Sequence, residues 1–389
     1  MDIYQEALQF HEKQRGKITI EPKNALHDRH DLSLQYTPGV AAASTAIAKN
    51  PARIWDLTAR GNQVAIVSNG TAVLGLGNIG AKAALPVMEG KAVLFKTFGG
   101  VDAFPICLDT EDPDAVIAIV QALAPVFGGI NLEDIKAPEC FYIERKLRDL
   151  LDIPVFHDDQ HGTAIVALAG VINAVTVVGK KMESVKVVIS GAGAAGTAIA
   201  RILHDRGVAD LVLVDSKGII SRDRTDLNEE KQSLLTWTNR QNLSGDLAAA
   251  MRGRDIFIGV SVGGLVTESM VRSMAPDPII VAMANPEPEI MPDVALAAGA
   301  AIVATGRSDF ANQVNNVLGF PSIFRGALDA KAKKITPAME IAAAETLASC
   351  VVNPHPTMII PDPLDRTVYK KVAAAVAAAV TPDNRRSES

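Results

Sequence analysis

The sequence is poor in cysteine and in aromatic residues. It has three cysteines, Cys107, Cys140 and Cys350, and their wide separation fits no metal-ligand spacing. A sparse, odd set of cysteines favours reduced thiols, so we expect a cytoplasmic protein without a disulfide framework. Aromatic residues make up 4% of the chain, whereas alanine, glycine and valine are abundant. This balance favours a parallel α/β fold in which helices pack closely on a sheet.

The chain also lacks a dense basic patch and a long apolar segment. Its formal net charge is −6 and its basic tracts are short, so neither nucleic acid nor a membrane surface is an expected partner. The longest apolar stretch, residues 164–178, contains Thr and Asn and is shorter than the roughly 20 residues that span a bilayer. We interpret it as a buried helix. The amino terminus has acidic residues and no apolar run, so no signal peptide is expected.

Short apolar runs that alternate with helical periodicity predict an α/β unit in the first half of the chain. Residues 64–67, 92–95 and 105–108 are expected to be buried strands, and residues 114–123 and 138–151 are expected to be helices. The segment at residues 3–14 has a weak helical period, and it could pack on this chain or on a second subunit.

A second α/β unit is predicted after residue 184. Five apolar runs separated by helical segments imply a doubly wound parallel sheet. These runs are Val185–Ser190, Leu211–Asp215, Ile256–Val260, Ile279–Ala282 and Ala301–Ala304. We therefore expect two domains, residues 1–160 and residues 161–389.

A glycine-rich loop from Gly191 to Gly196 follows the first of these strands and opens a helical segment. Gly191 permits a tight turn, Gly193 lets the backbone approach a pyrophosphate, and Gly196 allows close helix–strand packing. Ala194 and Ala195 place backbone N–H groups at the positive end of the helix dipole. In this context the loop predicts dinucleotide binding rather than a glycine turn without a ligand.

The residues at the end of the next strand bear on the choice of dinucleotide. Asp215 lies 19 residues after Gly196, where a carboxylate accepts hydrogen bonds from ribose hydroxyls and repels a 2′-phosphate. Ser216 and Lys217 follow directly and could instead accommodate that phosphate. The sequence therefore leaves both NAD and NADP as possible cofactors and slightly favours NAD.

Two acidic pairs in the first half predict a metal site. Glu133-Asp134 and Asp158-Asp159 each follow an expected strand, and the carboxyl ends of adjacent parallel strands lie at one edge of a sheet. Carboxylates are ligands for Mg²⁺ or Mn²⁺. The alternative is solvated loop acids or helix caps, which a single pair would favour. His157 and His161 flank the second pair, and we interpret them as structural.

Tyr36 and Lys91 are candidates for proton transfer. Tyr36 precedes a turn fixed by Pro38 and Gly39, and Lys91 begins an expected buried strand, where burial would lower its pKa. On spacing alone, each is more often an ordinary surface or boundary residue, and Lys96 is a competitor for the lysine role.

These residues lie in motifs that together resemble the bacterial, short-subunit malic enzymes. The resemblance runs from about residue 15 to residue 350, in the family's order. It rests on the segments Tyr36-Thr-Pro-Gly, Thr71-Ala-Val-Leu-Gly-Leu-Gly-Asn-Ile-Gly, Glu89-Gly-Lys, Phe104-Pro-Ile-Cys-Leu-Asp, Phe156-His-Asp-Asp-Gln-His-Gly-Thr and Gln313-Val-Asn-Asn-Val.

The resemblance implies an oxaloacetate-decarboxylating malate dehydrogenase with a malic-enzyme domain, a Rossmann-type domain and a homodimeric or higher homo-oligomeric assembly. Such an enzyme converts (S)-malate to pyruvate and CO₂, reduces NAD or NADP, requires Mg²⁺ or Mn²⁺, and also decarboxylates oxaloacetate. The roles that it implies are general acid for Tyr36, general base for Lys91, metal ligand for Glu133, Asp134 and Asp159, a carboxylate near the lysine for Asp158, and substrate or nicotinamide contact for Asn285 and Asn316.

One position departs from the family pattern. Larger eukaryotic-type members carry an arginine where this chain has Ala72, so the group that holds the distal malate carboxylate is not identified. Two other readings of the sequence are a metal-independent two-domain amino-acid dehydrogenase and an inactive regulatory protein that binds a dinucleotide. The acidic pairs argue against the first, and the retained Tyr36 and Lys91 argue against the second.

Overall fold

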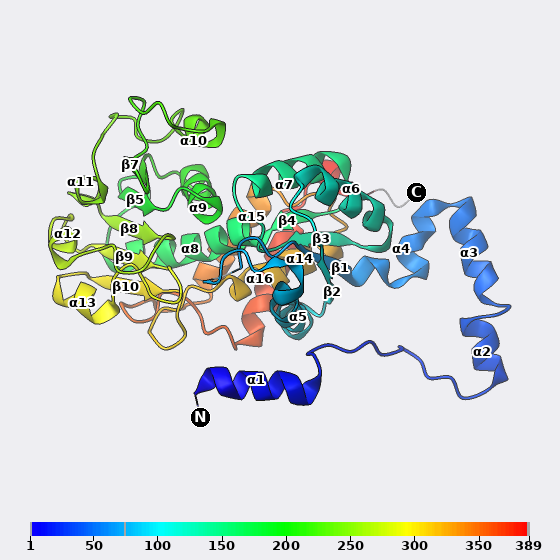
Figure 1. Cartoon of the computed structure of the whole chain (residues 1–389). Coiled ribbons are helices and arrows are strands. Elements are labelled where there is room, and N and C mark those ends of the chain that lie inside the picture. Colours follow the sequence, from blue (N-terminus) through cyan, green and yellow to red (C-terminus); the bar gives the residue numbers. More distant parts are fainter. Residues whose placement is uncertain (1, 74, 387–389) are drawn as a thin grey trace.

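The computed structural model describes residues 2–73 and 75–386, which form a two-sheet body and an amino-terminal arm (Figure 1). The first sheet has four strands in the order β2-β1-β3-β4, and the second has six in the order β10-β9-β8-β5-β6-β7. The predicted α/β class is confirmed, as is the doubly wound second sheet.

The first sheet is entirely parallel and is covered by helices on both faces. Along β1, Ala65 and Val67 pack with helices α6 and α7, whereas Val64 and Ile66 pack on the side of α5 and α14. The elements of this unit are β1 (Gln63–Ser68), α5 (Gly80–Gly99), β2 (Asp102–Cys107), α6 (Pro113–Leu123), β3 (Gly129–Leu132), α7 (Glu139–Leu150) and β4 (Val155–His157).

The prediction of a strand at residues 92–95 is wrong, because this segment belongs to the 20-residue helix α5. A short apolar run is compatible with a buried strand and equally with part of a buried helix. The periodicity of the longer window distinguishes the two, since the buried positions of α5 recur every three or four residues. They are Ala81, Ala84, Met88, Lys91, Ala92, Phe95 and Gly99. Lys91 therefore lies in the middle of a helix.

All five strands predicted for the second sheet are present and parallel, and a short antiparallel strand, β7, extends one edge. The strands are β5 (Lys186–Ser190), β6 (Asp210–Asp215), β7 (Gly218–Ile219), β8 (Ile256–Gly259), β9 (Ile279–Ala282) and β10 (Ile302–Thr305). The helices between them are α9 (Ala194–Asp205), α10 (Glu229–Leu234), α11 (Leu247–Met251), α12 (Glu268–Arg272) and α13 (Pro292–Ala297).

The helices at the carboxyl end of the chain return to the first sheet. These are α14 (Phe320–Asp329), α15 (Pro337–Ser349) and α16 (Arg366–Ala378); α14 and α16 lie beside α5, whereas α15 packs on α8 (Figure 1). The Phe324 ring packs edge-on against Phe95 and Phe156, with centroids 5.4 and 5.9 Å apart. The buried apolar cluster that contains these rings also includes residues of β5, β8, β9 and β10, so one continuous core joins the two sheets.

Helix α8 (Asp158–Val177) connects the two sheets and carries the longest apolar stretch of the sequence. By length and composition it could cross a membrane, but 72% of its most apolar window is buried inside the protein. It packs against α9 and α15. The expectation of a buried helix is confirmed, and the helix begins at Asp158, earlier than predicted.

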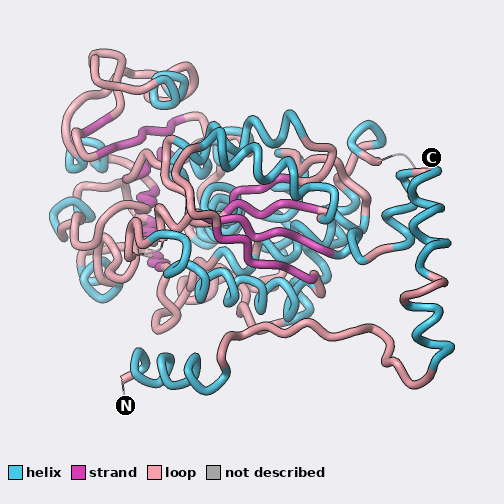
Figure 2. Tube along the Cα trace, turned by 45° about the vertical axis from the view of Figure 1, so that its right-hand side comes forward, coloured by secondary structure: helices cyan, strands magenta, loops and turns pink. Residues whose placement is uncertain are grey.

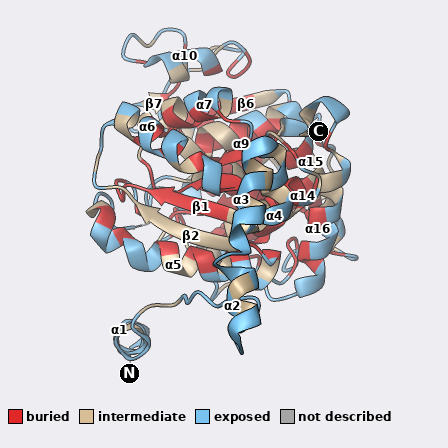
Figure 3. Ribbon diagram, turned by 90° about the vertical axis from the view of Figure 1, so that its right-hand side faces the viewer, coloured by how far each residue is buried: buried red, intermediate tan, exposed pale blue. Residues whose placement is uncertain are grey.

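The amino-terminal arm extends away from the body (Figures 1 and 2). Its helices are α1 (Ile3–Gln14), α2 (Arg29–Gln35), α3 (Val40–Lys49) and α4 (Ile54–Leu57), and none of them contains a buried residue. Figure 3 shows α2, α3 and α4 largely exposed, in front of the buried strand β1 in that view. The arm therefore contributes almost nothing to the core of its own chain.

Candidate active site

The carboxyl ends of β3 and β4 bring the two acidic pairs together. The strands are adjacent, with Leu132 opposite His157 in the register. Glu133 and Asp134 follow β3 directly, and Asp158 and Asp159 form the first residues of α8. The second pair is therefore held by a helix rather than by a loop, which fixes its backbone.

Three of these carboxylates form a group that fits a divalent cation. Oxygen atoms of Glu133, Asp134 and Asp159 all lie within 4.8 Å of one another. The Asp134 Oδ2 atom is buried and has no hydrogen-bond partner. Burial, followed by the charges of Asp159 and Glu133, raises the pKa of Asp134 to about 9. Clustered buried carboxylates with an unpartnered oxygen are suited to a hard cation such as Mg²⁺ or Mn²⁺.

The Lys91 ammonium lies beside this group. The Lys91 side chain is 7% exposed, and its Nζ donates to Glu133 Oε1 at 2.8 Å and to Asp158 Oδ2. It also lies 4.1 Å from the centroid of the Phe320 ring. By contrast, the competing lysine, Lys96, points to the surface and pairs with Asp102 at 2.6 Å.

The expected lowering of the Lys91 pKa is wrong for this arrangement. Burial does lower it, but the charges of Asp158 and Glu133 and their hydrogen bonds outweigh burial and raise the pKa above its ordinary value. The expectation failed because it placed Lys91 in an apolar strand. In the structure Lys91 is buried between two carboxylates.

Asp158 is enclosed by groups from both halves of the chain. Its Oδ2 accepts from Lys91 and, at 2.6 Å, from Asn316 Nδ2, which lies in the helical turn Asn316–Leu318. Its Oδ1 faces Gly162, where an added Cβ would lie 1.8 Å away. Asn316, expected at the substrate or the nicotinamide, thus contacts the carboxylate next to Lys91.

The glycine loop has the predicted strand–turn–helix setting. Gly191 has a φ of +107°, and a Cβ there would lie 2.6 Å from the Val260 carbonyl oxygen. A Cβ on Gly196 would lie 1.7 Å from the Gly191 carbonyl oxygen, whereas Gly193 faces open space. Helix α9 begins at Ala194. The loop therefore has the close packing and the open approach that a pyrophosphate requires.

Asn285 lies where the two halves of the chain meet. It follows β9, and its Nδ2 donates to the Met283 carbonyl oxygen at 3.2 Å. A Cβ built on Gly75 would lie 3.7 Å from the Asn285 carbonyl oxygen. A first-half loop thus approaches the segment that follows β9 at the carboxyl edge of the second sheet.

Tyr36 does not join the other predicted residues within one chain. It caps the carboxyl end of α2 on the amino-terminal arm, and it is 68% exposed. Helix α2 projects from the body, whereas α5, which carries Lys91, packs against β2 (Figure 1). A single copy therefore brings together Lys91, Asp158, Asn316 and the three clustered carboxylates without the tyrosine.

Two features of the site were not identified from the sequence. Asn131 Nδ2 donates to Glu133 Oε2 at 2.8 Å and orients that carboxylate. Its signal is a polar residue inside the buried strand β3. Arg224 and Lys231 both bind Asp215. They lie in irregular chain and a short helix after Asp215, where the sequence offers no comparable signal.

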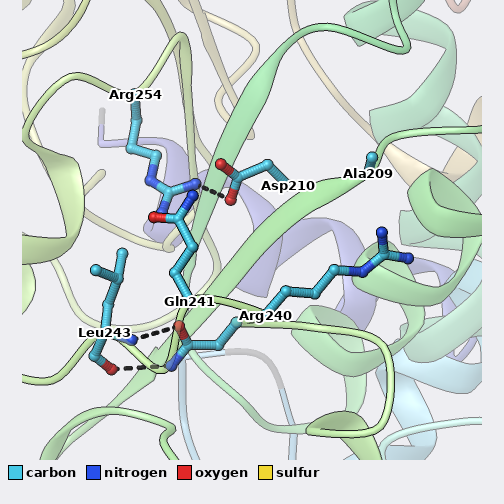
Figure 4. Close-up of a pocket in the computed structure, with 7 residues that line it drawn as sticks. Ala209, Asp210, Arg240, Gln241, Leu243 and Arg254 are labelled. Carbon is cyan, nitrogen blue, oxygen red and sulfur yellow. Dashed lines mark hydrogen bonds and ion pairs between the residues drawn. The ribbon is translucent and has the colours of Figure 1, made fainter.

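A pocket elsewhere in the second domain is separate from this site. It has a volume of about 130 Å³ and lies at the amino end of β6, opposite the end that carries Asp215. Figure 4 shows Arg254 turned toward Asp210 and the Arg240 side chain directed away. The guanidinium of Arg254 already forms an ion pair with the Asp210 carboxylate. We assign no part of the chemistry to it.

Comparison with known proteins identifies the family. Residues 15–148 match the family model described as malic enzyme, N-terminal domain, and residues 160–383 match that described as malic enzyme, NAD binding domain. The chain belongs to the malic enzyme family. Matches to this one family in both halves do not favour the amino-acid dehydrogenase or the inactive regulator.

Relatives in this family include enzymes that use either dinucleotide. The bifunctional malic/malolactic enzyme of Bacillus subtilis is 54% identical, over 97% of this chain and 93% of that protein. The NAD-dependent malic enzyme of Geobacillus stearothermophilus is also 54% identical, over 94% and 76%. The NADP-dependent malic enzyme of Escherichia coli is 49% identical, over 97% of this chain and 52% of that longer protein.

Solved malic enzymes share the whole fold. The structure from Pyrococcus horikoshii has a TM-score of 0.96 at 49% identity and covers 99% of this chain and 92% of that one. The NAD-dependent malic enzyme of Thermotoga maritima has a TM-score of 0.93 at 50% identity, with coverage of 95% and 98%. The architecture of this malic enzyme is therefore that of the family.

Proposed function

We propose that this chain oxidatively decarboxylates (S)-malate to pyruvate and CO₂, reduces NAD or NADP, requires Mg²⁺ or Mn²⁺, and also decarboxylates oxaloacetate. The observation that carries the proposal is the contact of Lys91 with Glu133 and Asp158, beside the three-carboxylate group. We propose that residues 1–160 supply most of the acid–base and metal chemistry and that residues 161–389 bind the dinucleotide. The expected cytoplasmic location stays a prediction.

Glu133, Asp134 and Asp159 would hold the metal ion. When bound, the ion supplies Lewis-acid chemistry toward the substrate hydroxyl and carboxylate oxygens. Engagement of Glu133 as a ligand would leave less negative charge to hold the Lys91 ammonium, and the pKa of Lys91 would then fall. The metal site and the proton-transfer lysine are therefore coupled through one carboxylate.

Lys91 is the proposed general base. Neutral Lys91 takes the proton of the malate C2 hydroxyl while hydride passes from C2 to the nicotinamide. Asp158 contacts the Lys91 Nζ, so this carboxylate is placed to exchange a proton with the ammonium. Loss of the C4 carboxyl as CO₂ then leaves an enolate of pyruvate, which needs a proton at C3.

The test of the lysine role compares two variants. Lys91→Met removes the proposed base, and we expect malate-dependent reduction of the dinucleotide to fall by at least about 10³-fold. Lys96→Met is the matched control, since it removes a lysine five residues away that pairs at the surface. Turnover near the normal value in Lys91→Met, or an equal loss in both variants, would remove Lys91 from the base role.

Tyr36 is the proposed acid for C3, and we propose that it acts on a second copy of the chain in a homodimer. The arm that carries it has no buried helical residue, and large apolar side chains are exposed along it. They are Ile3, Tyr4, Leu8, Phe10, Ile18, Ile20, Leu26, Leu32 and Leu34. Apolar side chains concentrated on one extended segment mark a protein-interaction surface.

A second copy is the partner that this arm fits, because each Lys91 site lacks the acid that the other copy's arm carries. A two-fold assembly exchanges the arms and completes both sites. Complementation tests this. Tyr36→Phe and Lys91→Met, each nearly inactive alone, are co-expressed and the mixed dimers are assayed.

In a hybrid dimer one site has both defects and the other has neither. Since about half of randomly assorted dimers are hybrids, exchange predicts recovery of about a quarter of the wild-type activity. Native mass measurement of the mixture, with one variant carrying a mass tag, checks that the subunits assort into hybrid dimers. No recovery in the Tyr36 mixture would contradict action across the dimer.

A further inference from the structure

Asp215 lies where the adenosine ribose of a dinucleotide would be read. It ends β6, the strand beside β5, and the Gly191 N–H donates to the carbonyl oxygen of the preceding residue, Val214, at 2.8 Å. In folds of this kind, an acidic residue at this place accepts hydrogen bonds from the ribose hydroxyls, provided that its oxygen atoms are free.

Both oxygen atoms of Asp215 are already occupied. Oδ1 accepts from the Lys217 backbone N–H at 2.9 Å and from Arg224 Nη1 at 2.7 Å. Oδ2 accepts from Arg224 Nη2 at 3.1 Å and from Lys231 Nζ at 2.6 Å. Two hydrogen bonds to each oxygen fill the in-plane positions of a carboxylate. A ribose hydroxyl would have to displace a charge-assisted bond, which is among the stronger kinds.

Arg224 joins the two carboxylates of a charged cluster formed by Asp215, Lys217, Arg224, Asp226 and Lys231. Its Nε and Nη2 donate to Asp226 at 2.9 and 2.7 Å, and its Nη1 also donates to the Gly218 carbonyl oxygen at 3.3 Å. Together with the two bonds to Asp215, these contacts use all five N–H donors of the guanidinium. Arg224 thus holds two carboxylates in place and has no N–H donor left for a ligand.

The two lysines of the cluster do have donors left. Lys231 Nζ binds Asp215, and Lys217 Nζ binds Asp226 at 2.9 Å, so each ammonium has one carboxylate contact in the described structure. An ammonium has three N–H donors. Counting Lys217, Arg224 and Lys231 against Asp215 and Asp226, the cluster carries a net charge of 3 − 2 = +1.

We infer that this cluster selects NADP, with Lys217 and Lys231 binding the 2′-phosphate. The inference rests on the proposed dinucleotide-dependent function and assigns its cofactor. A phosphate group offers acceptor oxygens to the remaining N–H donors of both ammonium groups, and it meets a net positive charge. The 2′-hydroxyl of NAD meets a carboxylate whose acceptor positions are taken. The sequence-based preference for NAD assumed that Asp215 was free.

Binding of the reduced dinucleotides, measured without malate or metal, tests the inference separately from catalysis. We expect the wild-type Kd for NADPH to be at least about tenfold lower than that for NADH. The same difference is expected between adenosine 2′,5′-bisphosphate and AMP as competitors, which isolates the 2′-phosphate. The affinity for NADPH should fall more steeply with salt than the affinity for NADH.

Lys231→Met removes one ammonium and keeps the apolar stem. It should raise the Kd for NADPH about tenfold and change the Kd for NADH by less than about twofold. Lys217→Met should act in the same direction. The matched control is Lys186→Met at the opposite, amino end of β5, which should change neither Kd.

Two outcomes would overturn the inference and leave dinucleotide binding intact. One is NADH binding as tightly as NADPH, and the other is an equal effect of Lys231→Met on both dinucleotides. Failure of either dinucleotide to bind would instead contradict the proposed function together with the inference.

Discussion

Gly162 shows how closely one residue of the site is constrained. It lies one helical turn after Asp158 in α8, and a Cβ there would lie 1.8 Å from Asp158 Oδ1. We predict that Gly162→Ala displaces the Asp158 carboxylate from Lys91 and lowers malate turnover at least about tenfold, with destabilisation of about 1–3 kcal/mol.

Gly170→Ala is the control in the same helix, because its added Cβ would meet its nearest atom at an ordinary 3.6 Å. Steady-state kinetics and thermal unfolding of both variants check the prediction. Equal turnover in the two variants would show that the position of Asp158 does not matter.

Asp159 is predicted to bind the metal directly. Because its Oδ2 already accepts from the Asp134 N–H at 2.9 Å, Asp159 orders the neighbouring carboxylate as well. Asp159→Ala should shift the Mn²⁺ titration of activity by at least about tenfold and remove most of the rise in Tm that Mn²⁺ produces. Asp152→Ala, at an exposed acid between α7 and β4, should change neither. An unchanged titration would exclude Asp159 from the ligands.

Cys140 gives a prediction about pH. Burial, followed by the charge of Glu144, raises the pKa of its thiol to about 12. At pH 8 the group is therefore almost entirely the neutral thiol, and thiolate accumulates only as the pH rises toward 12. We expect the native protein to leave Cys140 unmodified by a thiol reagent at pH 8 and to expose it on unfolding. Rapid modification of Cys140 in the native state would contradict this burial.

At the scale of elements, the sequence predicted the second sheet well because five β-branched runs are separated by clear helical segments. It failed at α5, where Ala92–Phe95 has the composition of a buried strand. The carboxylate group was predictable because parallel strands that follow one another along the chain end at one edge. The contacts of Arg224 and Lys231 with Asp215 were not predictable. The two residues follow Asp215 by nine and sixteen positions, and the segment between has no periodic pattern that would place them beside it.

The amino-terminal arm is the element whose packing is incomplete within a single chain. Deletion of residues 2–35 removes α1 and α2 and should convert a dimer to a monomer in native mass measurement. NADPH binding should persist, because β5, β6 and α9 lie in the body. A deletion variant that remains dimeric would place the subunit contact elsewhere.

At the scale of the molecule, two sheets share one core through α8 and the helices at the carboxyl end. Phe320, which follows β10 in the chain, packs on Phe95 from α5, and its ring lies beside Lys91 Nζ. Asn316, which also follows β10, donates a hydrogen bond to Asp158. The proton-transfer residues of the first sheet are therefore held by segments that follow the dinucleotide-binding sheet in the chain.

The central claim is that this fold joins metal-assisted acid–base chemistry to hydride transfer from malate. Purified protein is incubated with (S)-malate and NADP or NAD, with Mn²⁺ or with a chelator, and reduced dinucleotide and pyruvate are both measured. We predict equal amounts of the two products, formed only with malate and metal and faster with NADP. No malate- and metal-dependent product with either dinucleotide would contradict the account.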